Sequence, residues 1–165
     1  MMALLPLSAS VIDSSAHGFT VKHEVVLSAT PEEAYKAFSE NVGSWWNGDH
    51  TFSGNAESMV FMESCLCEIW GEDRQNKVEH MRMVNVQPPM MMRMQGGLGP
   101  LQGMAVAGSM TISFQESESG TQVTMVYTVG GYYPQGLAFL AVPVDGVLGE
   151  QMQRFQQFVE SRRNE

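Results

Sequence analysis

The amino-acid sequence predicts an α+β domain in which a curved antiparallel sheet of about six or seven strands wraps around one long C-terminal helix. Three observations lead to this fold class. Between residues 18 and 129, segments of alternating apolar and polar residues recur with the two-residue period of strands. Between residues 144 and 159, apolar residues instead recur every three or four positions, as in an amphipathic helix. Two short helices are expected after the first strand.

Length and charge limit the classes of function. The chain has 165 residues, of which 44% are hydrophobic, and this is enough for one domain with a single core. Eighteen acidic residues against nine Lys and Arg give a formal net charge of -9. This charge repels a phosphate backbone, so nucleic acid is not an expected partner. No apolar run approaches the roughly 20 residues that cross a bilayer, so no membrane span is expected.

Residues 1–17 are expected to form a flexible N-terminal segment, and residues 18–165 a single domain. Residues 3–7 are apolar and are followed by three small residues, as in the last part of an export signal. The basic segment and the longer apolar stretch of a complete signal are missing. A periplasmic or secreted location is therefore one expectation, and a cytoplasmic protein with a frayed terminus is the alternative.

Residues 18–27 alternate and predict a first, half-buried strand. Thr30 then precedes Pro31 and Glu33. In this arrangement Thr30 caps a helix, proline occupies its first position and Glu33 completes a capping box. A short helix is therefore expected from residue 31 to about residue 41.

Short strands are expected through residues 58–95, because no stretch between the glycine and proline breakers keeps helical spacing. A pair of prolines marks the turn between the last two of them. Two strands of clean alternation follow, at residues 110–114 and 123–129, joined by a polar turn at residues 116–120. A helix of about five turns over residues 144–159 completes the domain and ends at two arginines, which suit its negative pole.

The order of elements and three local features resemble the START-like superfamily, often grouped as SRPBCC domains. The features are the early strand followed by ATPEEAYKAF, the adjacent tryptophans, and the strand, proline, strand passage RMVNVQPPMMMRM. Members include the birch-pollen allergen, polyketide cyclases and homologues of the Hsp90 ATPase activator, and the resemblance covers residues 18–161. It implies the helix-grip fold, with a cavity between sheet and helix that members use for lipids, sterols, plant hormones, polyketides or client proteins. Membership of a fold does not by itself determine which reaction, if any, a protein catalyses.

The leading hypothesis is a non-catalytic domain that holds a hydrophobic or amphipathic small molecule in this cavity, without a cofactor or a metal ion. Burial of apolar surface would supply the affinity, and one or two polar groups would fix the orientation. Glu68 and His80 are the expected polar anchors. The expected lining comes from inward-facing positions of the strands and helices: Trp46, Phe61, Met92, Met110, Tyr127 and Phe155.

Three other functions stay open. An enzyme would use the same cavity for proton transfer in a cyclisation, dehydration or hydrolysis, with His80 or Glu68 as the titrating group. A protein-interaction module, as in the activator homologues, would need an exposed apolar patch. Soft-metal binding would rest on Cys65, Cys67, His80 and the 14 methionines of the chain.

Several of these residues also have structural interpretations. Six methionines lie between residues 81 and 94, and they are expected either to replace leucine in the core or to line an adaptable pocket. His23 lies on the apolar face of the first strand, where a hydrogen-bonded structural role is expected. Of the adjacent Trp45 and Trp46, one is expected to face the core and the other the pocket mouth or solvent.

Cys65 and Cys67 are two positions apart. On a regular strand their Cα atoms would lie roughly 6.5 Å apart with parallel side chains, a poor geometry for a disulfide, so buried free thiols are expected. As half of a zinc site the two thiols lack a second pair of ligands. The glycines of residues 96–103 do not match the GxGxxG spacing of nucleotide sites, and this loop is expected to be a mobile rim of the cavity.

Overall fold

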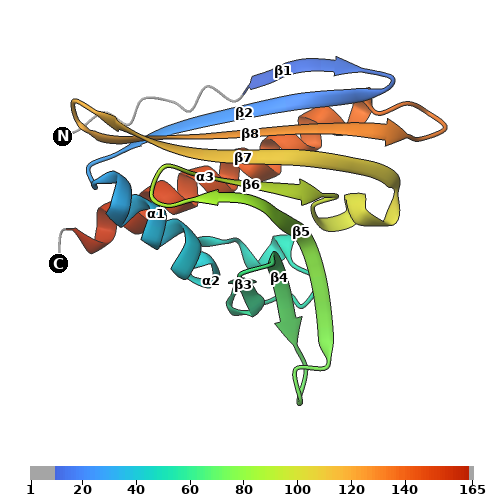
Figure 1. The fold of residues 1–165 in the computed structure, drawn as a ribbon. Coiled ribbons are helices and arrows are strands. Elements are labelled where there is room, and N and C mark those ends of the chain that lie inside the picture. Colours follow the sequence, from blue (N-terminus) through green and yellow to red (C-terminus); the bar gives the residue numbers. More distant parts are fainter. Residues whose placement is uncertain (1–9, 164–165) are drawn as a thin grey trace.

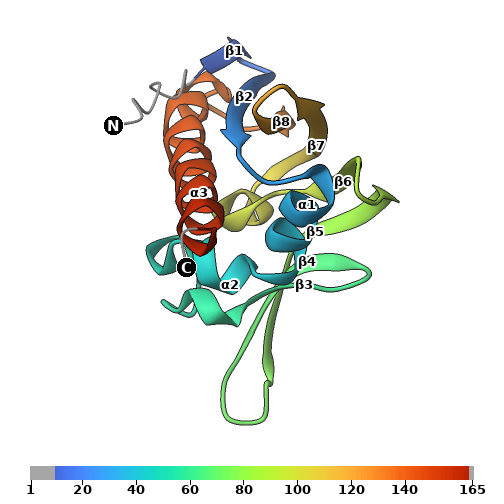
Figure 2. The ribbon, with the colours of Figure 1, turned by 90° about the vertical axis from the view of Figure 1, so that its left-hand side faces the viewer.

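In the computed structural model of the protein, which describes residues 10–163, one antiparallel sheet of eight strands curls around a C-terminal helix (Figures 1 and 2). The strand order is β1-β2-β8-β7-β6-β5-β4-β3, so every neighbouring pair except β2 and β8 is consecutive in the sequence. The pairing of β2 with β8 places the first part of the chain next to the last part within the sheet. The α+β fold class expected from the sequence is confirmed.

The elements have the following bounds. The strands are β1 (Ser10–Ser15), β2 (Gly18–Leu27), β3 (Met59–Phe61), β4 (Cys65–Trp70), β5 (Asn76–Gln87), β6 (Met91–Gly96), β7 (Ala105–Ser117) and β8 (Gly120–Tyr132). The α-helices are α1 (Pro31–Glu40), α2 (Val42–Trp45) and α3 (Ala141–Arg162). Four short 3-10 turns are η1 (Gly48–His50), η2 (Ala56–Ser58), η3 (Gly99–Gly103) and η4 (Ala138–Leu140).

Helix α1 begins with the expected capping box. Thr30 Oγ1 accepts a hydrogen bond from Glu33 N at 3.3 Å, and Glu33 Oε2 accepts one from Thr30 N at 2.9 Å. These two bonds satisfy backbone N–H groups that a helix leaves free at its first turn. The capped helix then buries Ala34 and Phe38 against the core.

An aromatic cluster joins the three helices on the concave side of the sheet. The ring of Phe38 on α1 lies 4.9 Å from that of Trp45 on α2 and 5.1 Å from that of Phe155 on α3, and Trp45 and Phe155 are 5.3 Å apart. Tilted and edge-on contacts at these distances suit the charge distribution of aromatic rings. This cluster packs α1, α2 and α3 against one another. None of the helices in residues 10–163 has the length and apolarity that crossing a bilayer requires.

Residues 10–15, which the sequence analysis assigns to a flexible segment, form the edge strand β1. It pairs with β2, and the register shifts between Val11 and Asp13. This shift interrupts the alternation by which a strand is recognised in a sequence. Residues 1–9, which hold the apolar stretch of the expected export signal, lie outside the described residues.

Cys65 and Cys67 form a disulfide, so the expectation of free thiols was wrong. Their Cα atoms are 5.5 Å apart, closer than roughly 6.5 Å on a regular strand. The cause is an irregularity in the pairing of β4 with β5, whose register shifts between Leu66 and Cys67. Both thiols are thereby removed from the possible metal ligands. Within residues 10–163, no three His, Cys, Asp or Glu residues are grouped so as to hold a metal ion.

Most methionines of the central strands pack in the core. Met81, Met92 and Met94 are each 1% exposed, as expected for residues that replace leucine. Met90, beside the proline turn, is 59% exposed. None of these four side chains lines the cavity described below.

Candidate ligand-binding site

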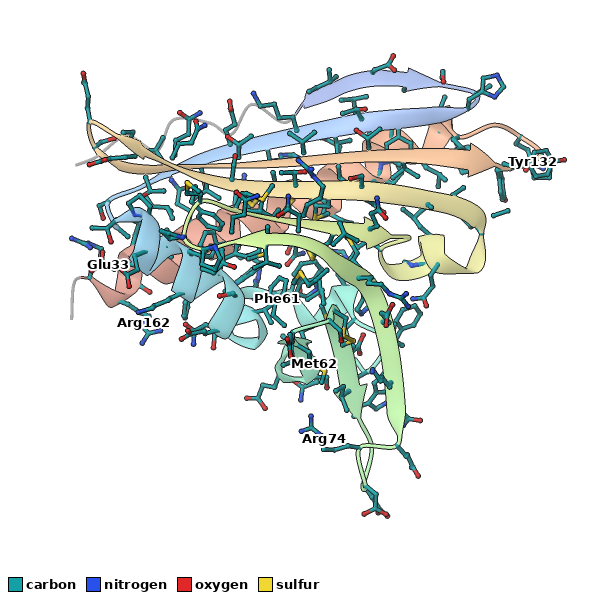
Figure 3. The ribbon with its side chains drawn as sticks, viewed as in Figure 1. Glu33, Phe61, Met62, Arg74, Tyr132 and Arg162 are labelled. Carbon is teal, nitrogen blue, oxygen red and sulfur yellow. A yellow bond between two sulfur atoms is a disulfide. The ribbon has the colours of Figure 1, made fainter. Side chains whose placement is uncertain are left out.

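A cavity of about 320 Å³ lies at the end of the sheet where α3 begins. Tyr132, labelled in Figure 3, marks this end, and Glu33 and Arg162 mark the opposite one. Three segments form most of the wall: the beginning of α3 with η4, the loop that carries η3, and the segment that follows α2. His80 on β5 and Tyr127 on β8 complete it. The apolar part of the lining includes Trp46, Phe52, Leu98, Leu101, Val144 and Leu148.

The size of the cavity limits the ligand. A cavity of about 150 Å³ accommodates one benzene molecule. The present cavity has roughly twice that volume, so it fits an apolar molecule of about two rings or a chain of similar bulk. A second depression, between α1 and the last turns of α3, is rimmed by the charged side chains of Glu33, Lys36, Glu40, Arg162 and Arg163 and is less suited to such a molecule.

Three of the residues proposed from the sequence, Trp46, His80 and Tyr127, line the cavity. Glu68 lies outside the lining but hydrogen-bonds to His80. The other four pack in or against the hydrophobic core, outside the lining: Phe61 (labelled in Figure 3), Met92, Met110 and Phe155. Alternation indicates which side chains face the concave side, but not where packed helices leave space.

Sequence reasoning missed the parts of the wall that come from loops and from the beginning of α3. Phe52 lies in a polar loop, and Leu98 and Leu101 lie in the glycine-rich loop. For Leu98 and Leu101 a usable signal was present, because apolar residues isolated in a glycine-rich loop need a place to be buried, whereas Phe52 stays 51% exposed. Val144 and Leu148 were recognised as helix residues of the apolar face, but not as part of a cavity wall.

Glu68 is a fully buried carboxylate that holds the segment after η1 in place. Its Oε2 accepts hydrogen bonds from Phe52 N at 3.0 Å and from His80 Nε2 at 3.1 Å, and its Oε1 accepts one from Ser53 N at 2.5 Å. Burial alone would raise the pKa of this carboxyl, but the hydrogen bonds outweigh burial and hold the pKa below its usual value of 4.5. Glu68 is therefore ionised at neutral pH.

His80 connects Glu68 to the opposite wall. While Nε2 donates to Glu68, Nδ1 accepts a hydrogen bond from Gly99 N at 3.3 Å. The ring also stacks on Phe52, with 5.8 Å between centroids. Burial lowers the pKa of His80 and outweighs the opposing effect of Glu68. The imidazole is therefore neutral at pH 7, with its proton on Nε2, and the lone pair of Nδ1 is already occupied.

These contacts form one continuous connection from Phe52 and Ser53 through Glu68 and His80 to Gly99, which we call the Glu68–His80 bridge. The side chain of Tyr127 holds the loop that contains Gly99 at a second place. Its hydroxyl donates to Gly96 O at 3.0 Å and accepts from Leu98 N at 3.1 Å, and burial raises its pKa to about 12. The rim that was expected to be mobile is therefore fastened by hydrogen bonds from two buried side chains.

A second buried histidine lies under α3. His23 is fully buried, and its Nε2 lies 3.0 Å from Asp145 Oδ1, although neither ring nitrogen makes a well-aligned hydrogen bond. Burial lowers the pKa of His23 and outweighs the attraction of Asp145. Gly149 makes room for this ring, because a Cβ there would lie 2.9 Å from His23 Cε1.

Acidification is expected to destabilise the protein below about pH 6.5, the usual pKa of histidine. His23 and His80 have lowered pKa values in the folded chain, so the unfolded chain binds protons first as the pH falls. Stability is then complete above pH 6.5 and declines as the pH falls towards the pKa values of the folded state. Urea unfolding near pH 7.5 and pH 5.5 measures this change. In a His80→Gln variant the free energy of unfolding should fall less between the two pH values. His17→Gln is the control, because His17 is exposed, and its free energy of unfolding should fall as in the wild type. Equal stability of the wild type at both pH values would contradict the expectation.

The curved sheet around a long C-terminal helix is the helix-grip fold that was expected from the sequence. Solved structures match nearly the whole chain. A protein from Mesorhizobium loti is 13% identical, with a TM-score of 0.60 over 86% of this chain and 97% of that chain. An AHSA1-like protein from Aeromonas hydrophila is 10% identical, with a TM-score of 0.57 over 88% and 95%. CalU16 from Micromonospora echinospora is 10% identical, with a TM-score of 0.52 over 86% and 74%.

These likenesses show the fold, since the identities are too low to carry an activity. No family model matches the chain. No curated protein matches it either. The function must therefore be argued from the cavity itself.

Proposed function

We propose that this domain binds an apolar or amphipathic small molecule in the cavity at the beginning of α3 and does not transform it. The observation that carries the proposal is the cavity of about 320 Å³, whose wall is mostly apolar and includes a few polar side chains. Such a composition is typical of ligand sites, where apolar contact gives affinity and a few polar groups give orientation.

The expected affinity is moderate. A ligand of about two rings buries roughly 250 Å² of apolar surface, as a large aromatic side chain does. At about 25 cal/mol per Å², this burial contributes about 6 kcal/mol. Part of this free energy is lost in fixing the ligand. Dissociation constants from tens of micromolar to millimolar are therefore expected.

The hydrogen bonds of the cavity support binding rather than proton transfer. The Nδ1 lone pair of His80 accepts the Gly99 N–H, and the Tyr127 hydroxyl is engaged both as donor and as acceptor. A general base needs a lone pair within reach of the proton that it removes. These two side chains instead hold the wall of the cavity.

A Val147→Phe substitution tests the proposal. Val147 lines the cavity, so the larger side chain should occupy the space of the ligand. Binding of the two-ring dye 1-naphthylamine, which is uncharged near pH 7.5 and is followed by its fluorescence, should weaken by at least about tenfold, a loss of about 1.4 kcal/mol. Circular dichroism and urea unfolding establish that the variant is folded.

Val142→Phe is the matched control, because Val142 lies on the same helix, is 72% exposed and does not line the cavity. This variant should bind the dye like the wild type. Failure of the wild type to bind uncharged apolar probes, or equal binding by wild type and folded Val147→Phe, would overturn the proposed function.

A further inference from the structure

We infer that the cavity selects its ligand by charge: it accepts an uncharged or cationic apolar molecule and rejects a carboxylate amphiphile such as a fatty acid. The inference rests on the proposed binding function and adds the chemical class of the ligand. It follows from the charged groups around the cavity, from its inner wall to its mouth.

Among the residues of the described chain, the lining offers no lysine or arginine to a carboxylate. Its two histidines are engaged, His50 with Glu150 and His80 with Glu68 and Gly99. A carboxylate moved into an apolar site loses its hydration and needs an ion pair or several hydrogen bonds in return. The N–H groups that could serve it on the inner wall, those of Phe52, Leu98 and Gly99, already donate to Glu68, Tyr127 and His80.

A negative charge lies directly behind the inner wall, on Glu68. Glu68 has no exposed surface, and its partners there are two backbone N–H groups and one imidazole. Since His80 is neutral, the Glu68–His80 bridge has a net charge of about -1 next to the cavity. Charges interact strongly across a poorly hydrated interior, so this group repels an anion and attracts a cation.

The mouth carries a second negative charge. Asp49 lines the cavity and is exposed, and its carboxylate has no hydrogen bond or ion pair with any residue from 10 to 163. The neighbouring Glu150 is already engaged, because its carboxylate bonds to Asn47 Nδ2 and lies 3.0 Å from His50 Nε2. Asp49 is thus available to an ammonium or hydroxyl group at the end of a ligand whose apolar body fills the cavity.

One feature of the mouth opposes this selection. The N-terminal end of α3 lies at the cavity, and a helix N-terminus attracts anions by about 0.3–1 kcal/mol. The local sequence weakens this end as an anion site, because Ala141 N donates to Ala138 O and Pro143 has no N–H. The two carboxylates therefore outweigh the helix end.

Three ligands with the same ten-carbon chain separate the charge classes. Displacement of 1-naphthylamine by 1-decanol, decylamine and decanoate is measured near pH 7.5, below the solubility limit of decanol and below the critical micelle concentrations of the other two. Decanol and decylamine should displace the dye. Decanoate should be weaker than decanol by at least about tenfold, given two nearby negative charges and no partner cation.

An Asp49→Asn variant tests the contribution of the mouth. It should strengthen decanoate and weaken decylamine by about two- to fivefold, the effect of an exposed charge pair, and should leave decanol unchanged. Asp73→Asn is the matched control, because Asp73 is exposed and does not line the cavity. It lies in the β4–β5 hairpin beside Arg74, which is labelled in Figure 3. This variant should change none of the three affinities.

The outcomes separate the inference from the proposed function. If decanoate displaces the dye as well as decanol does, the charge selection is wrong and the binding function stands. If the dye binds but Asp49→Asn changes no affinity while decanoate stays weak, the contribution of Asp49 is wrong and the charge selection rests on Glu68 alone. If neither the dye nor any of the three compounds binds, the proposed function is wrong and the inference falls with it.

Discussion

A Glu68→Leu substitution is expected to lower the free energy of unfolding by about 3–5 kcal/mol. The variant removes the acceptor of three hydrogen bonds, from Phe52 N, Ser53 N and His80 Nε2, and leaves three donors without a partner. Each buried donor that loses its partner costs about 1–3 kcal/mol, and water that enters from the cavity offsets part of the loss. Urea unfolding followed by circular dichroism measures the effect.

Glu63→Leu is the control for this substitution, since Glu63 is exposed in the turn before β4. A surface change of this kind should alter stability by no more than about 0.5 kcal/mol. Glu68→Gln should lie between the wild type and Glu68→Leu, because an amide keeps one acceptor oxygen but turns an N–H towards another donor. A loss of less than about 1 kcal/mol in Glu68→Leu would contradict the importance of the Glu68–His80 bridge.

A Gly108→Ala substitution is expected to destabilise the protein by about 2–4 kcal/mol and to weaken dye binding. A Cβ at this position of β7 would lie 2.3 Å from Tyr127 Cε2 and 2.8 Å from Cζ, so the buried ring must move. Movement of the ring displaces its hydroxyl from Gly96 O and Leu98 N, which position the rim loop. Urea unfolding and dye titration measure the two effects.

Gly103→Ala is the matched control, because it adds the same methyl group at a position with no heavy atom within 4 Å. It should leave both stability and binding close to the wild type. Tyr127→Phe separates the ring from its hydroxyl: it should bind the dye less tightly than the wild type while avoiding the clash. Wild-type stability of Gly108→Ala would show that β7 accommodates the methyl group by a small shift.

The sequence was sufficient where local patterns determine structure. The alternation in β2, β7 and β8, the capping box at Thr30 and the helical spacing of α3 each involve residues close in the chain. The adjacent tryptophans also divide as their spacing indicates. Trp45 packs on Phe38 and Phe155, and Trp46 lines the cavity.

The sequence was insufficient where distant segments determine structure. The register shift that brings Cys65 to Cys67 depends on the pairing of β4 with β5 and leaves no mark in the spacing of residues. Glu68 and His80 could be proposed as polar groups of the site, but their attachment to Phe52 N and Gly99 N depends on two loops that meet only in the folded chain. For the same reason, alternation could not separate Met110, in the core, from Tyr127, in the wall.

The Glu68–His80 bridge also lies across one boundary of the cavity. The two walls that it joins belong to loops far apart in the sequence, and each loop is outside the ladder of the sheet. Breaking either end of the bridge leaves a buried carboxylate or a buried imidazole with fewer hydrogen bonds, which costs free energy. Any opening of the cavity between these two loops therefore has to break hydrogen bonds of one buried ion or of its neighbouring ring.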